Sequence, residues 1–405
     1  MRKGWAETTL GEIADVIGGG TPSTAKPEYW GGEIVWLTPT EVVPRDGQLI
    51  IDSERRITTE GLKNSGAQLL PVGSVILTTR ASVGFVGISG VELSTNQGFQ
   101  SLVPSDEVLS KFLMYWIQAN RAEFESRAAG STFKEISRSN VKLVKMQLPA
   151  LADQRRIVDL VSSVDTYIDA LQQQAEVVRE ARNAVLHELL SAGGDDWTET
   201  TLGEIGLTGL FVDGDWVESK DQDPAGEFRL LQLADVGDGV FLDKSNRWMN
   251  SEQFGRLRCT SLRPRDILIA RMPDPIARAC VLPSGLPTCA TVVDVAILRC
   301  GEGSVPEFVA LVINDSAFRA GAQSLLTGTT RQRISRSNLA KIVLMVPSVV
   351  EQRRIVEVVS SMDEVIQSTE KAVSDAKSLR SGLLSDLLSG EREIPESYDR
   401  FLRAA

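Results

Sequence analysis

The stretch QRRIV occurs twice in this chain of 405 residues, at Gln154–Val158 and again at Gln352–Val356. Each copy comes shortly after a proline and begins a long segment in which apolar residues recur at alternating steps of four and three. This heptad spacing is typical of long helices that pair along one apolar stripe. Because the two segments are alike in length and frame, the sequence predicts two long helices that pair with each other.

The predicted seam between the helices consists of the apolar residues of these stripes. They are Ile157, Val161, Val164, Ile168, Leu171, Val178, Val185, Leu189, Ile355, Val359, Met362, Ile366, Val373, Leu383 and Leu387. Arg182 and Arg380 interrupt the two stripes at the same register, and Thr369 interrupts only the second. Parallel pairing would leave the chain without internal symmetry, whereas antiparallel pairing gives it a pseudo-two-fold axis. We expect the antiparallel form.

Two further repeats extend the duplication over the whole chain. WAETTLGEI at Trp5–Ile13 returns as WTETTLGEI at Trp197–Ile205, and ISRSN at Ile136–Asn140 returns at Ile334–Asn338. A period close to half the chain is too long for a solenoid, whose repeats run about 20–50 residues. It indicates two domain-sized copies, each a globular part followed by a helix. The expected boundaries are 1–150 and 194–348 for the globular domains, 151–193 and 349–391 for the helices, and 392–405 for a tail.

Each globular part alternates short β-rich runs with turns containing Gly, Pro and Ser, and has one apolar helix near its end. The fold class is therefore mixed α/β. Strands are expected at 34–37, 74–79 and 83–88, in places corresponding to 228–233, 266–270 and 292–298, and the helices at 112–120 and 308–316. The middles of the two copies diverge while their edges match. We predict a shared scaffold that differs where a ligand is read.

The composition indicates a globular protein without a membrane span. No apolar run reaches the 18 residues that a span requires, and the segment MRKGWAETTLGE has no apolar core of a secretory signal, so we expect a cytoplasmic location. The formal net charge is -11, and most of the excess acid falls in the two helical segments. The globular parts are close to neutral, so each can still present a local basic face to DNA.

Few residues could carry catalysis. GGGTP at Gly18–Pro22 lacks the GK[ST] ending of a phosphate-binding loop, and no methyltransferase cofactor loop or Asn/Asp-Pro-Pro-aromatic tetrad occurs. His187 is the only histidine and lies off the seam, which excludes a Ser/His/Asp site. The cysteines have no CxxC spacing, so we expect reduced thiols and no metal; they are Cys259, Cys280, Cys289 and Cys300. We expect no cofactor and no catalysis by the chain alone.

The strongest binding candidates lie in a repeated turn before the last strand of each copy. GSTFKEISRSN at Gly130–Asn140 answers GTTRQRISRSN at Gly328–Asn338, and both combine Gly, hydroxyls and cations, the groups that hold phosphates. The predicted phosphate contacts are Ser131, Thr132, Lys134, Arg138, Thr329, Thr330, Arg331, Arg333 and Arg336. Residues just after apolar strands are candidate base readers: Arg80, Ser82, Asn96, Gln97 and Arg271. The competing interpretation is a solvated loop whose arginines pair with local acids.

The chain resembles the specificity subunits of type I restriction–modification systems. The resemblance rests on the opening WxETTLGEI, on the GST/GTT…ISRSN turn, and on PALADQRRIV and PSVVEQRRIV at Pro149–Val158 and Pro347–Val356. The helix ends VLHELLSAG and GLLSDLLSG add to it. It covers nearly the whole chain, and the doubled arrangement of these motifs makes it specific.

Members of that family carry two target recognition domains separated by paired helices. The resemblance implies that the chain reads a bipartite, asymmetric site on double-stranded DNA, one half per domain, with the helices setting the gap. It also implies two bound methyltransferase (modification) subunits, which supply S-adenosylmethionine chemistry, and restriction subunits, which supply translocation and cleavage. The net acidity departs from what an isolated DNA-binding protein would show, so tight binding is expected only in the complex.

Two other functions are compatible with the sequence. A coiled-coil adaptor with protein-binding heads would show no nucleic-acid contact even with a methyltransferase present. A nuclease using Glu218-Ser219-Lys220 would nick DNA in the presence of metal, and Glu218→Ala would abolish that activity.

Overall fold

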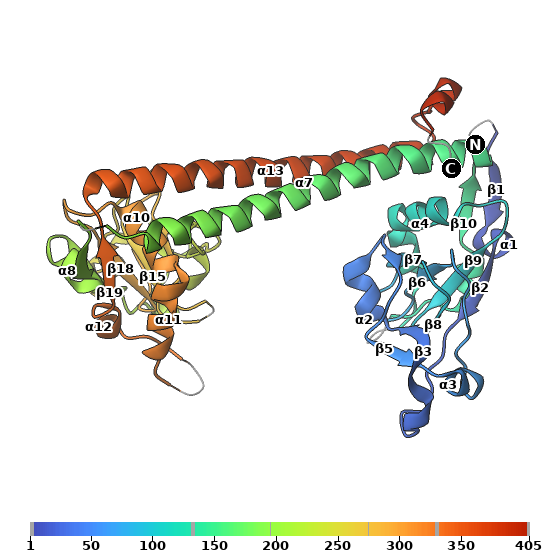
Figure 1. Cartoon of the computed structure of the whole chain (residues 1–405), viewed down its shortest axis with the longest axis horizontal. Coiled ribbons are helices and arrows are strands. Elements are labelled where there is room, and N and C mark those ends of the chain that lie inside the picture. Colours follow the sequence, from blue (N-terminus) through green and yellow to red (C-terminus); the bar gives the residue numbers. More distant parts are fainter. Residues whose placement is uncertain (1–3, 131–133, 195, 274, 329–331, 403–405) are drawn as a thin grey trace. The chain divides into compact units, whose positions relative to one another are not determined.

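The structure is a computed structural model that describes residues 4–130, 134–194, 196–273, 275–328 and 332–402. It divides into two compact units: unit 1 is Met1–Gln173 with Glu370–Ala405, and unit 2 is Gln174–Thr369 (Figure 1). Each unit therefore contains one globular domain together with half of each long helix. The mixed α/β class and the long paired helices are confirmed.

Unit 1 contains a five-stranded sheet of order β2-β9-β6-β7-β4 and a three-stranded sheet of order β5-β3-β8. The central strand β6 is buried at every position, as its uninterrupted apolar sequence requires, and the apolar helix α4 packs on β6 and β7. The strands are β1 Ala6–Thr9, β2 Ala14–Gly18, β3 Trp30–Leu37, β4 Leu49–Ile50, β5 Arg55–Ile57, β6 Val75–Leu77, β7 Val86–Ser89, β8 Leu93–Thr95, β9 Gln100–Pro104 and β10 Lys145–Leu148. The short helices are α1 Leu10–Ile13, α2 Pro39–Val42, α3 Thr59–Lys63, α4 Ser110–Ala119, α5 Arg121–Arg127 and α6 Arg138–Lys142.

Unit 2 repeats this plan with a four-stranded sheet of order β12-β18-β15-β16 and a three-stranded sheet of order β14-β13-β17. The strands are β11 Thr198–Thr201, β12 Leu210–Asp213, β13 Phe228–Leu231, β14 Trp248–Met249, β15 Ile267–Ala270, β16 Ala279–Val281, β17 Cys289–Thr291, β18 Val295–Arg299 and β19 Val343–Val346. The short helices are α8 Leu202–Leu207, α9 Ser251–Leu257, α10 Pro306–Asn314, α11 Ser316–Ser324 and α12 Arg336–Leu339.

One predicted strand correspondence was wrong. Strand β7, which overlaps the predicted 83–88 run, pairs antiparallel with β6, and its equivalent β16 pairs antiparallel with β15. The predicted 292–298 run instead forms β18, which is the equivalent of β9. The periodicity located both strands but could not reveal their partners.

The repeated WxETTLGEI motif closes each domain onto its long helix. Strand β1 pairs antiparallel with β10, and β11 pairs with β19, so the first strand of each domain lies against its last. The next turn is a capping box in both copies, Thr9 with Glu12 and Thr201 with Glu204. The motif therefore has a structural role in each domain, where it joins the first strand to the last and caps the following helix.

The long helices are α7, Leu151–Ser191, and α13, Val349–Ser389. In unit 1, Ile157 and Val161 near the start of α7 share a hydrophobic core with Leu384 and Leu387 near the end of α13. In unit 2, Leu186 near the end of α7 shares a core with the start of α13. The helices thus pair antiparallel in both units.

The predicted seam residues are buried or half-buried throughout both helices. Beyond Arg182 the fully buried residue of α7 is Leu186, one position after the half-buried Val185. Near the end of α13, Leu384 is likewise more deeply buried than its neighbour Leu383. An α-helix has about 3.6 residues per turn, so the buried stripe drifts from a strict seven-residue repeat.

Candidate nucleic-acid interface

Three chain segments that are distant in sequence meet at one edge of unit 1. The backbone N–H of Thr79 donates to Gly98 O at 2.8 Å, and the N–H of Ile136 donates to Thr79 O at 3.0 Å. The N–H of Ala81 donates to Lys134 O at 3.1 Å. The turn after β6, the connection from β8 to β9 and the segment before α6 are therefore side by side, which brings together the described candidates of this copy.

The side chains of this edge differ in their availability. Arg80 pairs with Glu135, with Nη2 and Oε2 2.7 Å apart, and both remain partly exposed. Gln97 is exposed and accepts a hydrogen bond of 2.6 Å from Thr21, whereas the Oδ1 of Asn96 accepts a hydrogen bond from the backbone N–H of Gly98. Ser82 is half-buried.

Lys134 and Arg138 are the exposed cations of the segment that follows, and Arg138 makes a long contact of 3.4 Å with Gln100. Their position fits a phosphate contact. Ser131 and Thr132 lie outside the described residues.

The repeated ISRSN stretch has a structural explanation in both copies. Ile136 and Ile334 are fully buried, and the following serines cap short helices: Ser137 accepts from Asn140 N at 3.2 Å and Ser335 from Asn338 N at 3.1 Å. Serine is among the preferred N-cap residues. The motif thus fixes the backbone of the turn and leaves its arginine at the first position of the helix.

Arg271, which also follows an apolar strand, is not the equivalent of Arg80. Its backbone N–H donates to Asp294 O, and its carbonyl accepts from Ile334, so it occupies the place of Thr79. The side chain is 7% exposed, binds Asp213, and donates to Ile334 O at 3.0 Å and Val293 O at 3.1 Å. A guanidinium with these partners holds the domain together and is not available to a base.

The other described arginines of this turn also have local partners. Arg333 forms an ion pair with Asp294. Arg336 donates to Phe211 O at 3.1 Å and lies 3.5 Å from Asp213. These contacts favour the interpretation that the arginines of this loop pair with local acids and do not bind phosphate. Both side chains are nevertheless about two-fifths exposed. Thr329, Thr330 and Arg331 lie outside the described residues.

A buried glutamine attaches each domain to its long helix. Gln154 accepts from Leu109 N at 2.9 Å and donates to Glu107 O and Pro149 O, both at 2.9 Å. Gln352 repeats this pattern with Val305 N at 2.7 Å. Leu109 and Val305 precede α4 and α10, so the first residues of the QRRIV motif fix each domain helix to the long helix.

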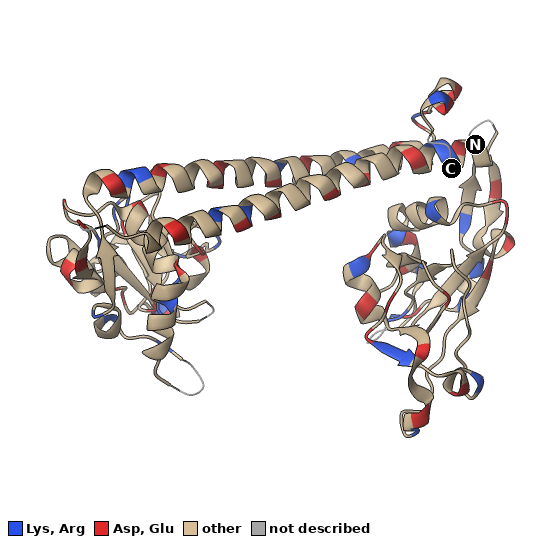
Figure 2. Ribbon diagram, viewed as in Figure 1, with Lys and Arg blue, Asp and Glu red and all other residues tan. Residues whose placement is uncertain are grey.

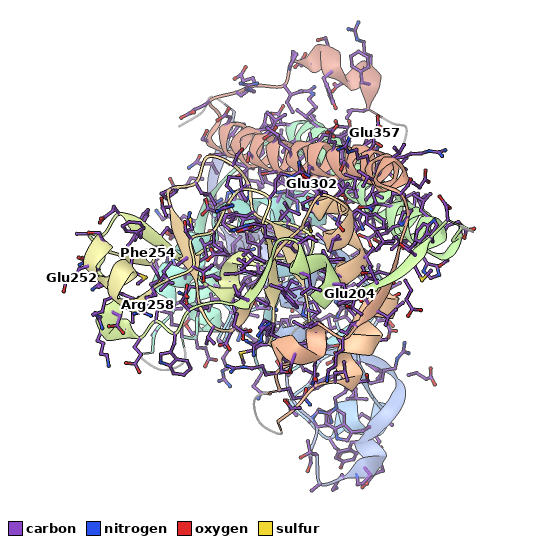
Figure 3. The ribbon with its side chains drawn as sticks, turned by 90° about the vertical axis from the view of Figure 1, so that its left-hand side faces the viewer. Glu204, Glu252, Phe254, Arg258, Glu302 and Glu357 are labelled. Atoms are coloured by element: carbon purple, nitrogen blue, oxygen red, sulfur yellow. The ribbon has the colours of Figure 1, made fainter. Side chains whose placement is uncertain are left out.

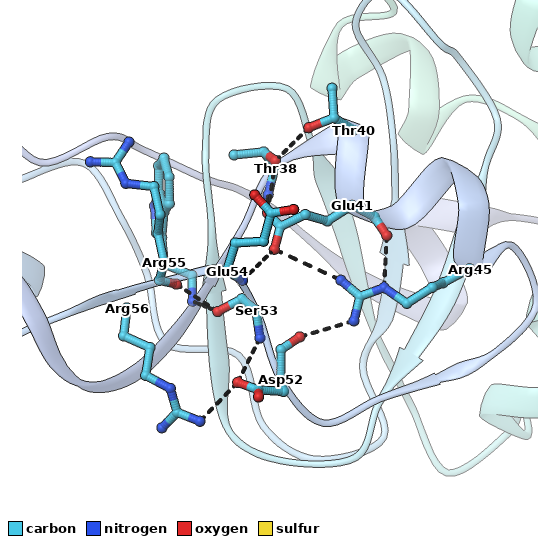
Figure 4. Close-up of polar contacts among 10 residues, drawn as sticks. Thr38, Thr40, Glu41, Arg45, Asp52, Ser53, Glu54, Arg55 and Arg56 are labelled. Carbon is cyan, nitrogen blue, oxygen red and sulfur yellow. Dashed lines mark hydrogen bonds and ion pairs between the residues drawn. The ribbon is translucent and has the colours of Figure 1, made fainter. Parts of the chain in front are cut away.

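A buried carboxylate that the sequence did not reveal closes a loop in each small sheet. Glu41 is 7% exposed and accepts from Thr38 N at 2.9 Å and from Glu54 N at 2.8 Å across the loop (Figure 4). Asp235 is fully buried and accepts from Gln232 N at 2.6 Å and from Ser245 N at 2.7 Å. The signal was present as two capping-type patterns at equivalent places, TPTE and QLAD.

The groups considered for catalysis have ordinary structural surroundings. Glu218 forms an ion pair of 2.6 Å with Lys220, which lowers the pKa of the carboxyl. Burial raises the pKa of Cys259 and Cys289 to about 11 and that of Cys280 and Cys300 to about 12, so these free thiols stay protonated. His187 is exposed on α7. Among the described residues, no group of three His, Cys, Asp or Glu side chains could hold a metal, and no helix could cross a membrane.

Comparison with known proteins finds a family model that matches residues 2–180. This model describes the type I restriction modification DNA specificity domain. The MjaIX specificity subunit of Methanocaldococcus jannaschii is 34% identical over 180 residues, 44% of this chain and 42% of the relative. The EcoR124I/EcoR124II specificity subunit of Escherichia coli is 28% identical over 41% of this chain and 42% of its own length. These two matches thus span less than half of either relative.

Two comparisons extend over the full length. The MjaVIII specificity subunit of M. jannaschii is 21% identical over 96% of this chain and 93% of its own. The S subunit from M. genitalium has a TM-score of 0.54 at 17% identity, covering 96% of this chain and 97% of that one. A structure described as underlying complex assembly and conformational transition of the type I R-M system has a TM-score of 0.60 at 16% identity, covering 96% and 98%. In its matched domain and in its fold, this chain is similar to the type I restriction–modification specificity subunits.

Proposed function

We propose that this chain is the DNA-recognition subunit of a type I restriction–modification complex. Each globular domain reads one half of a bipartite site on double-stranded DNA. Because the domains differ in sequence, the two halves differ and the site is asymmetric. The proposed domains are 1–150 and 194–348, with the helical segments 151–193 and 349–391 setting the distance between the half-sites and 392–405 as a tail.

The observation that carries this proposal is a scaffold that is duplicated while the parts it presents are not. The strand pairing of WxETTLGEI, the capped ISRSN turn and the buried glutamine recur in both units with the same partners. The residues at the exposed edge change. In unit 1 Glu135 forms a short β-bridge with Ala129, and in unit 2 Arg333 takes the place of Glu135, opposite Thr327. Two domains that share a scaffold but differ in their exposed residues are suited to bind two different stretches of one DNA molecule.

The chemistry of the complex belongs to other subunits in this proposal. The chain itself is non-catalytic, and S-adenosylmethionine would be held by the modification subunits, which dock on the paired helices in two copies. Restriction subunits would join the same assembly. The acidic surface of the helices suits protein docking better than DNA contact.

The test is a map of methylated bases. The chain is expressed with the modification subunit of its own system in a host without DNA methylation, and modified positions are read by single-molecule sequencing. A single split, asymmetric motif with a fixed gap and a methylated adenine in each half is expected. If the modification subunit is present and folded but no motif is modified, a protein-binding adaptor becomes the better explanation.

A further inference from the structure

The edge strands of the two small sheets carry arginines at equivalent positions. In unit 1, β3 pairs with β5 so that Trp36 faces Arg55 and Val35 faces Arg56. In unit 2, β13 pairs with β14 so that Arg229 faces Trp248, and the N–H of Leu230 donates to Arg247 O. Since Val35 and Arg229 occupy the same place against β8 and β17, Arg55 and Arg247 are equivalent.

Both arginines are exposed and directly follow a fixed loop. Glu41 binds the N–H of Glu54, one residue before Arg55, and Asp235 binds the N–H of Ser245, two residues before Arg247. The position of each arginine is thereby set by a buried carboxylate. Figure 2 shows β5 as a basic strand at the edge of unit 1.

Aromatic side chains pack on both small sheets: Trp30 lies against Arg55 in unit 1, and Phe254 supports the sheet that carries Arg247 in unit 2. The guanidinium of Arg55 lies 3.7 Å from the ring centroid of Trp30, a stacked geometry that leaves its edge N–H groups able to donate. In unit 2 the sheet is backed by α9, which carries Phe254 (Figure 3). The ring of Phe254 stacks on that of Phe228, with the centroids 4.4 Å apart. Neighbouring Arg56 differs because Asp52 lies 2.8 Å away and neutralises its charge.

We propose that Arg55 and Arg247 are equivalent contacts to DNA backbone phosphates, one in each domain. The inference rests on the proposed function and adds a site to it. The loops before the two arginines differ in sequence, so a cation kept at the same place in both must serve something that both half-sites share. The phosphate backbone is that shared feature, because base edges vary with sequence. Arginine is also suited to phosphate, since its fork can donate two hydrogen bonds.

The experiment uses the assembled complex of this chain with its modification subunit. Salt-dependent binding to the motif identified by the methylation map is measured for the wild type, R55Q and R247Q, with R56Q and the exposed R263Q as controls. Each of R55Q and R247Q is expected to weaken binding about 3–10-fold and to lower the slope of log affinity against log salt by about 0.9, as for one lost phosphate contact. The recognised motif should stay the same, and the controls should bind within about 2-fold of the wild type.

The outcomes separate the two proposals. If the wild-type complex shows no specific motif, the proposed function fails. If it does, but both variants bind with the wild-type salt slope, the phosphate contacts alone are refuted. A change of motif in either variant would make that arginine a base reader and would also overturn the inference. Unchanged thermal unfolding of R247Q, whose side chain has no aromatic stack to lose, ensures that binding rather than folding is measured.

Discussion

Arg182 on α7 forms an ion pair with Asp363 on α13, with Nε and Oδ1 3.0 Å apart. Arg380 and Asp165 form the same pair in unit 1, at positions equivalent by the internal repeat. The arginines that interrupt the apolar seam are therefore contacts between the helices, and each acid comes from the partner helix. Asp165 also accepts a 2.6 Å hydrogen bond from Tyr115 of α4, which extends this pair into the domain.

We expect the two ion pairs to differ in strength. Asp363 is two-fifths exposed, so Arg182→Met should lower the free energy of unfolding by only about 0.5–1 kcal/mol. Arg380 also reaches Gln118 at 3.2 Å, and its loss disturbs the Tyr115 contact, so Arg380→Met should cost about 1–2 kcal/mol. Urea unfolding of both variants measures the difference. Equal losses would show that the Tyr115 connection adds nothing.

Removing a buried glutamine should loosen a domain from its helix. Gln154→Leu leaves Leu109 N, Glu107 O and Pro149 O without their partner, at a cost of about 2–3 kcal/mol. Hydrogen exchange should accelerate at the start of α4, and urea unfolding gives the free energy. The exposed Gln173→Leu serves as a control on the same helix and should change stability by less than about 0.5 kcal/mol.

Arg271 and Arg138 should behave in opposite ways. Arg271→Met removes a buried guanidinium and leaves the charge of Asp213 with Arg336 as its remaining partner. The free energy of unfolding of unit 2 should therefore fall by about 2–4 kcal/mol. Arg138→Ala should leave stability nearly unchanged and weaken DNA binding of the complex at every sequence. Thermal unfolding measures the structural role of each arginine, and DNA-binding assays measure its role in recognition. A stable Arg271→Met variant with a changed motif would restore Arg271 as a reader.

The spacing role of the helices can be tested with matched deletions. Removing residues 168–174 from α7 and 371–377 from α13 keeps both heptad frames and both ion pairs in register. Seven residues correspond to about 10 Å of helix, so the gap should shorten by at most about three base pairs while the half-sites stay the same. Deleting either segment alone breaks the register and should abolish methylation. Altered half-site bases in the double deletion would contradict a spacing role.

The attachment of the tail should depend on pH. Arg156 lies 2.5 and 2.7 Å from the two carboxylate oxygens of Asp399 and lowers the pKa of that carboxyl below its usual range. A lowered pKa in the folded state gives stabilisation above about pH 4 that is lost as pH falls through the lowered value. Fluorescence anisotropy of a dye at the C-terminus should therefore stay constant from pH 8 to 5 and drop in stronger acid. Asp399→Asn should show the low anisotropy at all pH values.

The sequence predicted the scaffold because its signals are local and repeated. Heptad spacing located α7 and α13, and buried strands such as β6 and β15 follow from continuous apolar runs. Strand partners were less accessible: nothing in a run such as 292–298 tells which neighbour it will pair with. The seam drift to Leu186 was also hidden, since it accumulates over many turns.

The candidate interface was predicted less well, for a definite reason. Arg80 and Arg271 both follow an apolar strand, but a one-residue shift makes the first exposed and the second buried beside Asp213. Counting from a strand end cannot resolve such a shift, because side chains alternate between opposite faces. Arg55 and Arg247 were missed because their equivalence appears only through the ladder registers of β5 and β14.

The buried carboxylates Glu41 and Asp235 bear on how such a protein can change over generations. Each holds both ends of its loop, between which some residues, such as Val42, Ile50 and Val236, are buried in the core and the others are half-buried or exposed. Mutations at the exposed positions can alter what the loop touches without disturbing the scaffold that presents it. A gene can therefore vary the exposed positions of one loop independently of those in the other, as long as the buried positions stay apolar.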